Sequence, residues 1–418
     1  MPGGALLFVV DLVLLLCLAF QFAIAGFYFH LLYWLMELPK ADEAPSPLPA
    51  DLPQVLVQIP VFNELAVVER ALEAAAALDW PHDRLRIQLL DDSTDLTTDV
   101  ARHAVARLRG RGIDVEHLHR SDRTGFKARA LAEGMARNTA PYVAVFDADF
   151  VPAPDWLRRA MAALLAEPKA AFVQTRIEWG NGDTNWLTRA QRLMQDAHFA
   201  VEQDIRFRRG LPFQFNGTGG IWRRQAVEEA GGWSHDTLSE DLDLVLRTHL
   251  KGWRGVFMME PHVVGELPAR IEDFRAQQSR WSKGFVQVAR KLIPSIWRSD
   301  WSDEAKAMTT LQLFMQGIFP VLALGFVALL LSAFGHGGLP GFFRFLLWLW
   351  LASMLVILFG MTWGAYRRLV RGDIATYLVT ALSVPALIGY LAVANAGAIV
   401  GAGFGKKSEF TRTPKTGA

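Results

Sequence analysis

Residues 142–149 read YVAVFDAD, an apolar run that ends in two carboxylates separated by one residue. The run predicts a short buried strand over residues 142–146 that delivers Asp147 and Asp149 at its carboxyl end. Two carboxylates placed in this way can hold Mg²⁺ or Mn²⁺, with water and substrate phosphates as the remaining ligands. The alternative is a plain acidic turn, since Asp is common after strands.

Strands and helices alternate along the chain before this run. We expect strands at residues 55–59, 85–90 and 115–118, and helices at residues 65–77, 99–108 and 127–137. Such alternation predicts an α/β domain with a parallel sheet. Ligands of these sheets bind beyond the carboxyl ends of the strands, where residues 91–92 and 147–149 both fall. The two acidic clusters are therefore expected to face one ligand site.

The other of these clusters, Asp91-Asp92-Ser93, follows the strand at residues 85–90. Its carboxylates can accept hydrogen bonds from a nucleotide base or from ribose hydroxyls. The cluster could equally cap the next helix, because Ser, Thr and Asp are preferred N-caps. We expect both roles, with Asp95 as the cap and with Asp91 and Asp92 as the ligands.

A third cluster, Ser239-Glu240-Asp241, opens an expected helix over residues 241–250. The helix dipole stabilises a carboxylate in the first turn, so capping alone would explain this cluster. A carboxylate in this position can also serve as the general base that takes the proton of an attacking hydroxyl. We assign that role to Asp241 rather than to Glu240 or Asp243.

A fourth cluster contains Gln277, Arg280 and Trp281, which stand at i, i+3 and i+4 of an expected helix and so share one face. The forked guanidinium of Arg280 suits a pyrophosphate, and Trp281 offers a flat apolar face to a sugar ring. An amphipathic helix on a membrane surface would also carry Arg and Trp. The next segment, residues 285–297, is expected to be such an interfacial helix.

Three shorter features fit the same site. Pro60 and Glu64 lie in a loop after the first strand that can contact a base. Lys127 begins a helix whose N-terminus, with Arg123, can contact a diphosphate. The glycines of Asn216-Gly217-Thr218-Gly219-Gly220 allow the backbone to approach an acceptor closely.

Apolar segments flank this region on both sides. Residues 5–36 form a run that is too long for a signal peptide and has no basic start, which predicts a retained membrane anchor. Three further runs cover residues 309–334, 342–366 and 374–404. The last contains Pro385 and Gly389, so it forms either one tilted span with an interfacial helix or a hairpin of two spans.

The charges of the loops set the expected orientation. Residues 335–341 contain no Lys or Arg, whereas residues 367–371 contain three Arg. Because basic loops face the cytoplasm, residues 37–308 and the basic tail 405–418 are expected there. A tail on that side favours the hairpin. We expect an integral, multi-pass protein of the plasma or inner membrane with a cytoplasmic α/β domain.

Composition limits the other possibilities. The chain has 418 residues, is 51% hydrophobic and carries a net charge of +1, so no nucleic-acid partner is expected. The single cysteine, Cys17, excludes an intrachain disulfide and a zinc site built on thiolates. The expected division is an anchor, a proline-rich linker, an α/β domain, interfacial helices, a region of three or four spans and a tail, at residues 1–38, 39–53, 54–284, 285–308, 309–404 and 405–418.

In this order, the four clusters resemble the D, DxD, (T/S)ED and QxxRW pattern of family 2 glycosyltransferases of the cellulose-synthase-like superfamily. In detail the chain is most similar to glucomannan and mannan synthase-like members, at residues 90–95, 215–223, 238–244 and 407–415. Ser239 stands where Thr is commoner. The resemblance implies a GT-A fold, inversion at the anomeric carbon, a nucleotide-diphosphate sugar donor, and Mg²⁺ or Mn²⁺.

The resemblance also implies roles for individual residues. Asp91 or Asp92 would hold the nucleotide, and Asp241 would be the base. The diphosphate and metal would be held by Asp147 and Asp149. The acceptor end near the diphosphate would be lined by Asn216, Gly217, Thr218, Glu240, Gln277, Arg280 and Trp281.

We therefore expect transfer of hexosyl units from UDP-glucose or GDP-mannose to a growing β-glycan, processively and with export through the adjacent spans. The alternative is a single addition to a membrane lipid such as diacylglycerol, with the spans as anchor and lipid access. A third possibility is a catalytically inactive scaffold, and the intact Asp147, Asp241 and Arg280 argue against it. The donor sugar, the linkage and any export partner stay open.

Overall fold

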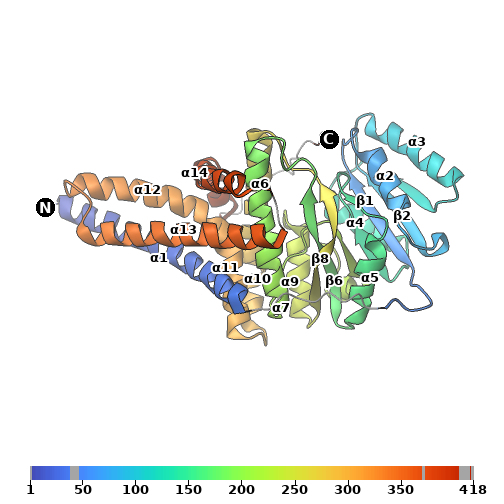
Figure 1. Ribbon diagram of the computed structural model, residues 1–418, viewed down its shortest axis with the longest axis horizontal. Helices are drawn as coiled ribbons and strands as arrows, with labels where there is room; N and C mark the ends of the chain where they lie inside the picture. Colours follow the sequence, from blue (N-terminus) through green and yellow to red (C-terminus); the bar gives the residue numbers. More distant parts are fainter. Residues whose placement is uncertain (1, 38–46, 370–371, 404–414, 416–418) are drawn as a thin grey trace.

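The structure, a computed structural model, describes residues 2–37, 47–369, 372–403 and 415. An α/β domain lies at one end, and long apolar helices extend away from it (Figure 1). Most of the expected tail and of the proline-rich linker falls outside the described residues.

A mixed sheet of eight strands forms the core of the α/β domain, in the order β3-β2-β1-β4-β7-β6-β8-β5. β1 is parallel to β2 and β4, and β2 is parallel to β3, which confirms the predicted parallel part. β7 then runs antiparallel between β4 and β6. The strands are β1 Val55–Val61, β2 Leu85–Asp91, β3 Val115–His119, β4 Tyr142–Val145, β5 Val151–Pro152, β6 Ala170–Trp179, β7 Gly220–Arg223 and β8 Arg254–Gly265.

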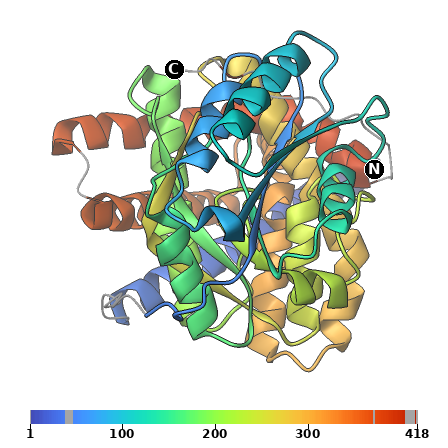
Figure 2. The same ribbon diagram turned by 90° about the vertical axis from the view of Figure 1, so that its right-hand side faces the viewer.

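Helices cover this sheet, and Figure 2 shows the domain end-on with the membrane helices behind it. β1, β2 and β6 are buried along almost their whole length, which explains why these segments are apolar runs in the sequence. The carboxyl ends of β1, β2 and β4 meet at one edge because these strands are parallel. The helices are α2 Val68–Ala76, α3 Thr97–Gly110, α4 Phe126–Ala136, α5 Trp156–Ala166, α8 Arg224–Glu229, α9 Glu240–Leu250 and the short η1 His82–Arg84.

α3 begins at Thr97, two residues before the predicted start at residue 99, and its N-cap lies one residue after the predicted Asp95. Leu96 is the N-cap residue and its side chain makes no capping bond. The Asp95 carboxylate still accepts a hydrogen bond from the Thr97 backbone N–H at 2.9 Å. Asp95 is therefore not the N-cap, although its oxygen satisfies an N–H of the first turn.

A long helical segment connects the sheet to the apolar helices. α6 Trp186–Ala197 begins with a capping box at Asn185 and continues as a π-helical turn, η2 His198–Gln203, and then as α7 Asp204–Arg208. π-helical turns are rare and occur frequently at functional sites. This one turns His198 and Glu202 toward the interior of the molecule, where both are largely buried.

One helix joins the last motif to the expected interfacial segment. α10 runs from Ile271 to Arg298 without a break, so residues 285–297 continue the helix of Arg280 and Trp281 rather than forming a separate one. Gly284 is required because a Cβ there would lie 2.0 Å from Ser239 Oγ. The absence of a side chain lets α10 pack directly against the beginning of α9.

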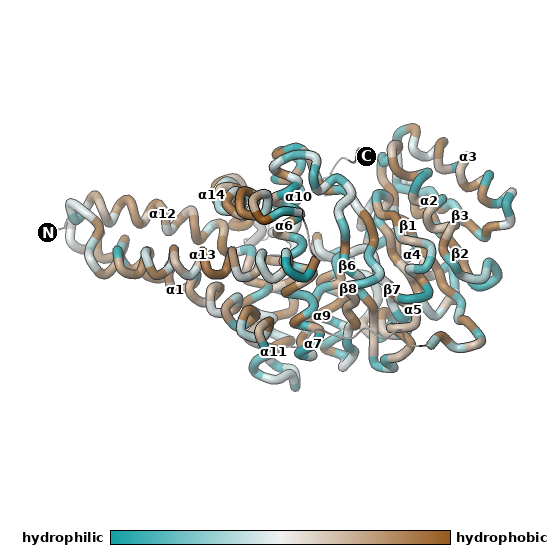
Figure 3. Tube along the Cα trace, in the orientation of Figure 1, coloured by the Kyte–Doolittle hydropathy of each residue, from teal (hydrophilic) through white to brown (hydrophobic). Residues whose placement is uncertain are grey.

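Within the part of the chain that the structure describes, four helices are long and apolar enough to cross a membrane: α1, α12 with the preceding α11, α13 and α14. They cover α1 Pro2–Glu37, α11 Asp303–Phe314, η3 Met315–Gly317, α12 Ile318–Gly335, α13 Gly341–Leu369 and α14 Ile374–Gly403. Figure 3 shows them as the most hydrophobic part of the chain. α1, α12 and α13 lie lengthwise, whereas α14 is seen nearly end-on and so crosses them (Figure 1).

The predicted hairpin at residues 374–404 is wrong, because α14 is a single helix. α14 crosses the other three helices and packs against α10, α12 and α6. The tail residue Lys415 contacts Asp149 of the α/β domain.

Candidate active site

One cavity of about 1250 Å³ extends from the carboxyl ends of the parallel strands to the apolar helices. Every residue predicted for the site lines this cavity except Asp91. The predicted residues that line it are Pro60, Glu64, Asp92, Lys127, Asp147, Asp149, Asn216, Gly217, Thr218, Glu240, Asp241, Gln277, Arg280 and Trp281. Clusters that lie up to 221 positions apart in sequence, from Pro60 to Trp281, therefore share one space.

The two carboxylates after β2 have different surroundings. Asp91 is fully buried and does not line the cavity. Burial opposes its ionisation, but hydrogen bonds from His117 at 2.9 Å and from Ser93 at 2.8 Å outweigh this and lower its pKa to about 2. Asp92 does line the cavity, and its two oxygens bind the Arg120 guanidinium at 2.7 and 2.6 Å. Of the predicted pair, Asp92 is the one positioned to meet a ligand.

Lys127 connects the carboxylate after β4 to the glycine-rich loop. Its Nζ lies 2.6 Å from Asp147 Oδ1 and 2.8 Å from the carbonyl oxygen of Gly217. Burial disfavours the charge on Lys127, but the carboxylates of Asp147, Glu240 and Asp241 outweigh burial and raise its pKa. The ammonium of Lys127, which lines the cavity, therefore stays charged.

The pair Asp147 and Asp149 fits a hard divalent cation. Both line the cavity, and Asp149 Oδ2 lies 2.5 Å from the ammonium of Lys415, so a cation already sits against this carboxylate. Burial is the main reason why the pKa of Asp149 is raised. The described residues contain no group of three His, Cys, Asp or Glu side chains that could hold a metal alone. The donor set thus suits an ion that takes its other ligands from phosphates and water.

Asp241 lies in the first turn of α9, beside the glycine-rich loop. Burial, and then repulsion from Glu240, raise its pKa to about 7 despite the nearby Lys127. A carboxylate with this pKa is matched to proton transfer near neutral pH. Gly217 has φ +80°, and a Cβ there would lie 3.0 Å from Asp241 Oδ2, so this position requires glycine.

Asp243, the rejected alternative for the base, points elsewhere. It is fully buried and its oxygens bind Arg247 and Lys291, each at 2.7 Å. It does not line the cavity, whereas Asp241 and Glu240 do. The preference for Asp241 over Asp243 therefore agrees with where the structure places the two side chains.

Arg280 projects from α10 into the acidic part of the cavity. Burial lowers its pKa, and the carboxylates of Glu240, Asp147, Asp241 and Glu64 counteract this. Gln277 and Trp281 line the same cavity, as expected of residues on one helix face. A guanidinium held among carboxylates at this place can neutralise charge on a bound diphosphate.

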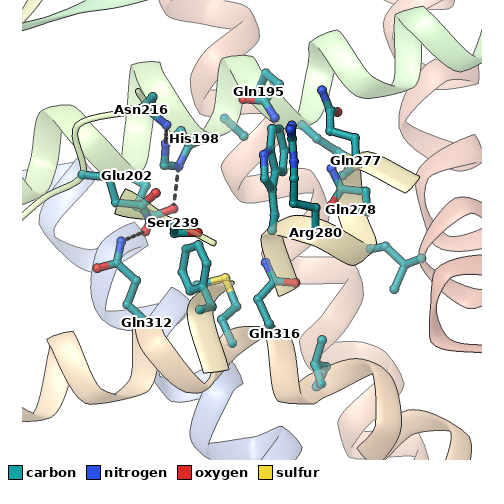
Figure 4. A pocket seen from close by; sticks show the side chains of 18 of the residues that line it. Gln195, His198, Glu202, Asn216, Ser239, Gln277, Gln278, Arg280, Gln312 and Gln316 are labelled. Carbon is teal, nitrogen blue, oxygen red and sulfur yellow. Dashed lines mark hydrogen bonds and ion pairs between the residues drawn. The ribbon is translucent and has the colours of Figure 1, made fainter. Parts of the chain in front are cut away.

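Sequence reasoning missed a second polar group deeper in the cavity. His198 Nδ1 lies 3.1 Å from Glu202 Oε2, and Gln312 Nε2 donates to Glu202 Oε1 at 2.9 Å. His198 Nε2 lies 3.1 Å from Asn216 Nδ2, which completes a chain of four side chains (Figure 4). These residues come from η2, α11 and the glycine-rich loop, and only the i, i+4 spacing of His198 and Glu202 could have drawn attention to them.

The sequence of the α/β domain matches a known protein family. A family model described as "Glycosyltransferase like family 2" matches residues 53–284. The chain belongs to this family. The match covers the whole sheet and ends just after Trp281, so it includes all four clusters.

Two relatives are similar to about three fifths of the chain. The chain is 44% identical over 254 residues to glucomannan 4-beta-mannosyltransferase 2 of Arabidopsis thaliana, which covers 60% of this chain and 48% of the relative. It is 42% identical over 265 residues to glucomannan 4-beta-mannosyltransferase 1 of Oryza sativa subsp. japonica, covering 62% and 51%. The matched part of the chain thus spans about half the length of these relatives.

A solved structure shares the fold across nearly the whole chain. The mannosyltransferase PcManGT from Pyrobaculum calidifontis, in complex with GDP-Man and Mn²⁺, aligns with a TM-score of 0.60 and 22% identity. The alignment covers 90% of this chain and 99% of that one. The family match and this likeness confirm the GT-A-like mixed sheet that the resemblance implied.

Proposed function

We propose that this protein is a membrane-bound, inverting glycosyltransferase that adds hexosyl units from a nucleotide-diphosphate sugar to a growing β-glycan. The observation that carries the proposal is the meeting, in one cavity, of a carboxylate pair at a strand end, the half-buried Asp241 and the Arg280 guanidinium. These groups are what sugar transfer needs: a site for the diphosphate, a base for the acceptor and a cation for the leaving group.

The donor is proposed to be GDP-mannose, with UDP-glucose as the alternative. The glucomannan mannosyltransferases and the structure with GDP-Man support the first. The nucleotide would lie between Pro60, Glu64 and Asp92, which line the cavity at the ends of β1 and β2. The diphosphate would extend from there toward Lys127 and Asp147.

The reaction follows from the positions of these side chains. An acceptor hydroxyl oxygen forms a bond to the anomeric carbon while the bond from that carbon to the diphosphate oxygen breaks. Asp241 accepts the hydroxyl proton, and the diphosphate leaves with the electron pair, stabilised by Arg280 and Lys127. Asp147 and Asp149 would hold Mg²⁺ or Mn²⁺, which when bound neutralises charge on the diphosphate. One displacement inverts the anomeric configuration.

The orientation and the acceptor path are also proposals. The basic end of α13 packs on the α/β domain, where Arg368 Nη1 lies 2.6 Å from Asp204 Oδ2, whereas residues 336–340 lie at the far end of the helices. This supports a cytoplasmic α/β domain in the plasma or inner membrane. The cavity continues between the apolar helices, so it supports a path for a growing chain.

Single addition to a membrane lipid is the second candidate. The deep part of the cavity is lined mainly by apolar side chains of the helices, among them Leu14, Leu18, Phe326, Leu347, Leu351 and Val384. Such a lining favours a hydrocarbon chain over a polymer rich in hydroxyl groups.

The test is donor screening with membranes that contain the full chain. Membranes with the unmodified chain and with Asp241→Asn are incubated with GDP-mannose or UDP-glucose and Mn²⁺ or Mg²⁺. We expect nucleotide release and a sugar polymer only with the unmodified chain. A product that carries one sugar on a lipid selects the second candidate, and no sugar transfer from either donor rejects the proposed function.

A further inference from the structure

The middle of the cavity is surrounded by neutral and acidic hydrogen-bonding groups. One wall contains the linked side chains of Asn216, His198, Glu202 and Gln312 (Figure 4). Other amides from α6, α10 and η3 line the same cavity. They are Gln195, Gln277, Gln278 and Gln316.

The side chains of this wall are buried and held in place by hydrogen bonds to one another. Glu202 is 5% exposed and Gln312 is 3% exposed, yet both line the cavity. Burial opposes the charge on Glu202, but the hydrogen bond and charge of His198, with Arg206 and Gln312, lower its pKa. An ionised carboxylate held this way accepts hydrogen bonds only, and each oxygen has a second lone pair for a ligand.

The wall adjoins the base directly. Asn216 precedes Gly217, the residue whose missing Cβ leaves room for Asp241. Besides its contact with His198, Asn216 is held by two further hydrogen bonds: its backbone N–H donates to Gln174 at 2.8 Å, and its Oδ1 accepts from Gln203 at 2.9 Å. A group bound along this wall therefore lies next to the position where an acceptor hydroxyl would meet Asp241.

The chemistry of the wall excludes two kinds of ligand. The Glu202 carboxylate would repel a phosphate, so the wall does not suit the donor. A hydrocarbon chain would offer no hydrogen-bond partner to the lone pairs of Glu202 that His198 and Gln312 leave open. Neutral hydroxyl groups can donate to the carboxylate and accept from the amides, so the wall suits a pyranose ring.

We propose that Asn216, His198, Glu202 and Gln312 form an acceptor subsite that binds the second sugar ring of the acceptor, the ring behind the one that reacts. This inference rests on the proposed function and adds to it a specific recognition of chain length. An acceptor of several sugars occupies the subsite, whereas an acceptor of one sugar does not reach it.

The test compares two acceptors on the purified full chain, with the donor selected by the screen. One acceptor is mannotetraose and the other is methyl β-mannoside. In Glu202→Gln and Gln312→Leu we expect kcat/KM for mannotetraose to fall about tenfold, because each variant removes a hydrogen bond to a buried hydroxyl. For methyl β-mannoside we expect no change, and the donor KM should also stay constant.

Asp204→Asn is the matched control. Asp204 is similarly buried, at 6% exposure, and lies two residues beyond Glu202, but it binds Arg368 and does not line the cavity. This variant should treat both acceptors as the unmodified chain does. Mannotetraose binding without donor, measured by calorimetry, should weaken in the two subsite variants and not in the control.

Two outcomes overturn the inference in different ways. Equal losses with both acceptors in Glu202→Gln and Gln312→Leu would assign these residues a structural role only. If the unmodified chain transfers sugar to neither acceptor nor to any membrane component, the proposed function fails and the subsite fails with it.

Discussion

The donor end and the acceptor end of the cavity are built in different ways. Donor-end groups such as Asp92, Asp147 and Asp149 follow strands directly and belong to short motifs. The polar wall at the acceptor end joins η2 to α11, and its members His198 and Gln312 are 114 positions apart. Functional residues at strand ends can be predicted from a short stretch of sequence. A binding wall between helices cannot, because its residues come together only when the chain folds.

The largest effect is expected where the two ends meet, at Asp241. Asp241→Asn keeps the size of the side chain but cannot accept the hydroxyl proton. We expect the rate of sugar transfer to fall about 10³-fold. Donor affinity, measured by calorimetry, should change little. An unchanged rate would remove Asp241 from the mechanism.

Asp243→Asn provides the control for this variant. The side chain lies on the same helix but binds Arg247 and Lys291 away from the cavity. We expect a lower melting temperature and a transfer rate per folded molecule within about threefold of normal, since surrounding structure rather than catalysis is affected. A rate loss as large as that of Asp241→Asn would mean that the two carboxylates act through a common structural effect.

Arg280 tests the donor end. Arg280→Lys keeps the positive charge but loses the fork that binds two phosphate oxygens. We expect kcat to fall about 10²-fold, as when one preorganised donor is removed from a developing charge. The fall should be similar for long and short acceptors, in contrast to the subsite variants. A loss confined to long acceptors would place Arg280 at the acceptor end instead.

The pH dependence follows from the pKa of Asp241, which burial and Glu240 raise to about 7. The protonated carboxyl cannot act as a base, so activity is present above this pKa and is lost as the pH falls through it. We expect kcat/KM to decline about tenfold per pH unit below pH 7. A profile that is flat between pH 5 and 8 would contradict this assignment of the base.

The smallest effect on catalysis is expected where the membrane helices join the α/β domain. Arg368→Gln breaks the buried pair with Asp204, whose carboxylate lies 2.6 Å from the guanidinium. We expect a lower melting temperature and a transfer rate per folded molecule within about twofold of normal. A change in the preference for long acceptors would show that this junction also shapes the acceptor end.

The sequence predicted the parallel part of the sheet because apolar runs and acidic turns mark buried strands and their ends. It could not predict that β7 inserts antiparallel between β4 and β6, since pairing partners are set by tertiary packing. The sequence left open which of Asp91 and Asp92 faces the cavity, because a motif does not reveal which of two adjacent carboxylates is enclosed by His117. The prediction of a hairpin at residues 374–404 was wrong because hydropathy reports the length of an apolar segment and not the direction of its helix. α14 is one helix that crosses its neighbours.

The anomeric configuration of the product tests the central claim most directly. The purified full chain in lipid nanodiscs is given the selected donor, whose sugar is α-linked to the diphosphate, together with Mn²⁺ and mannotetraose. NMR of the product then reports the new linkage. We predict a β-linked sugar, because Asp241 serves a single displacement. An α-linked product would show that the configuration is retained and would contradict a single displacement.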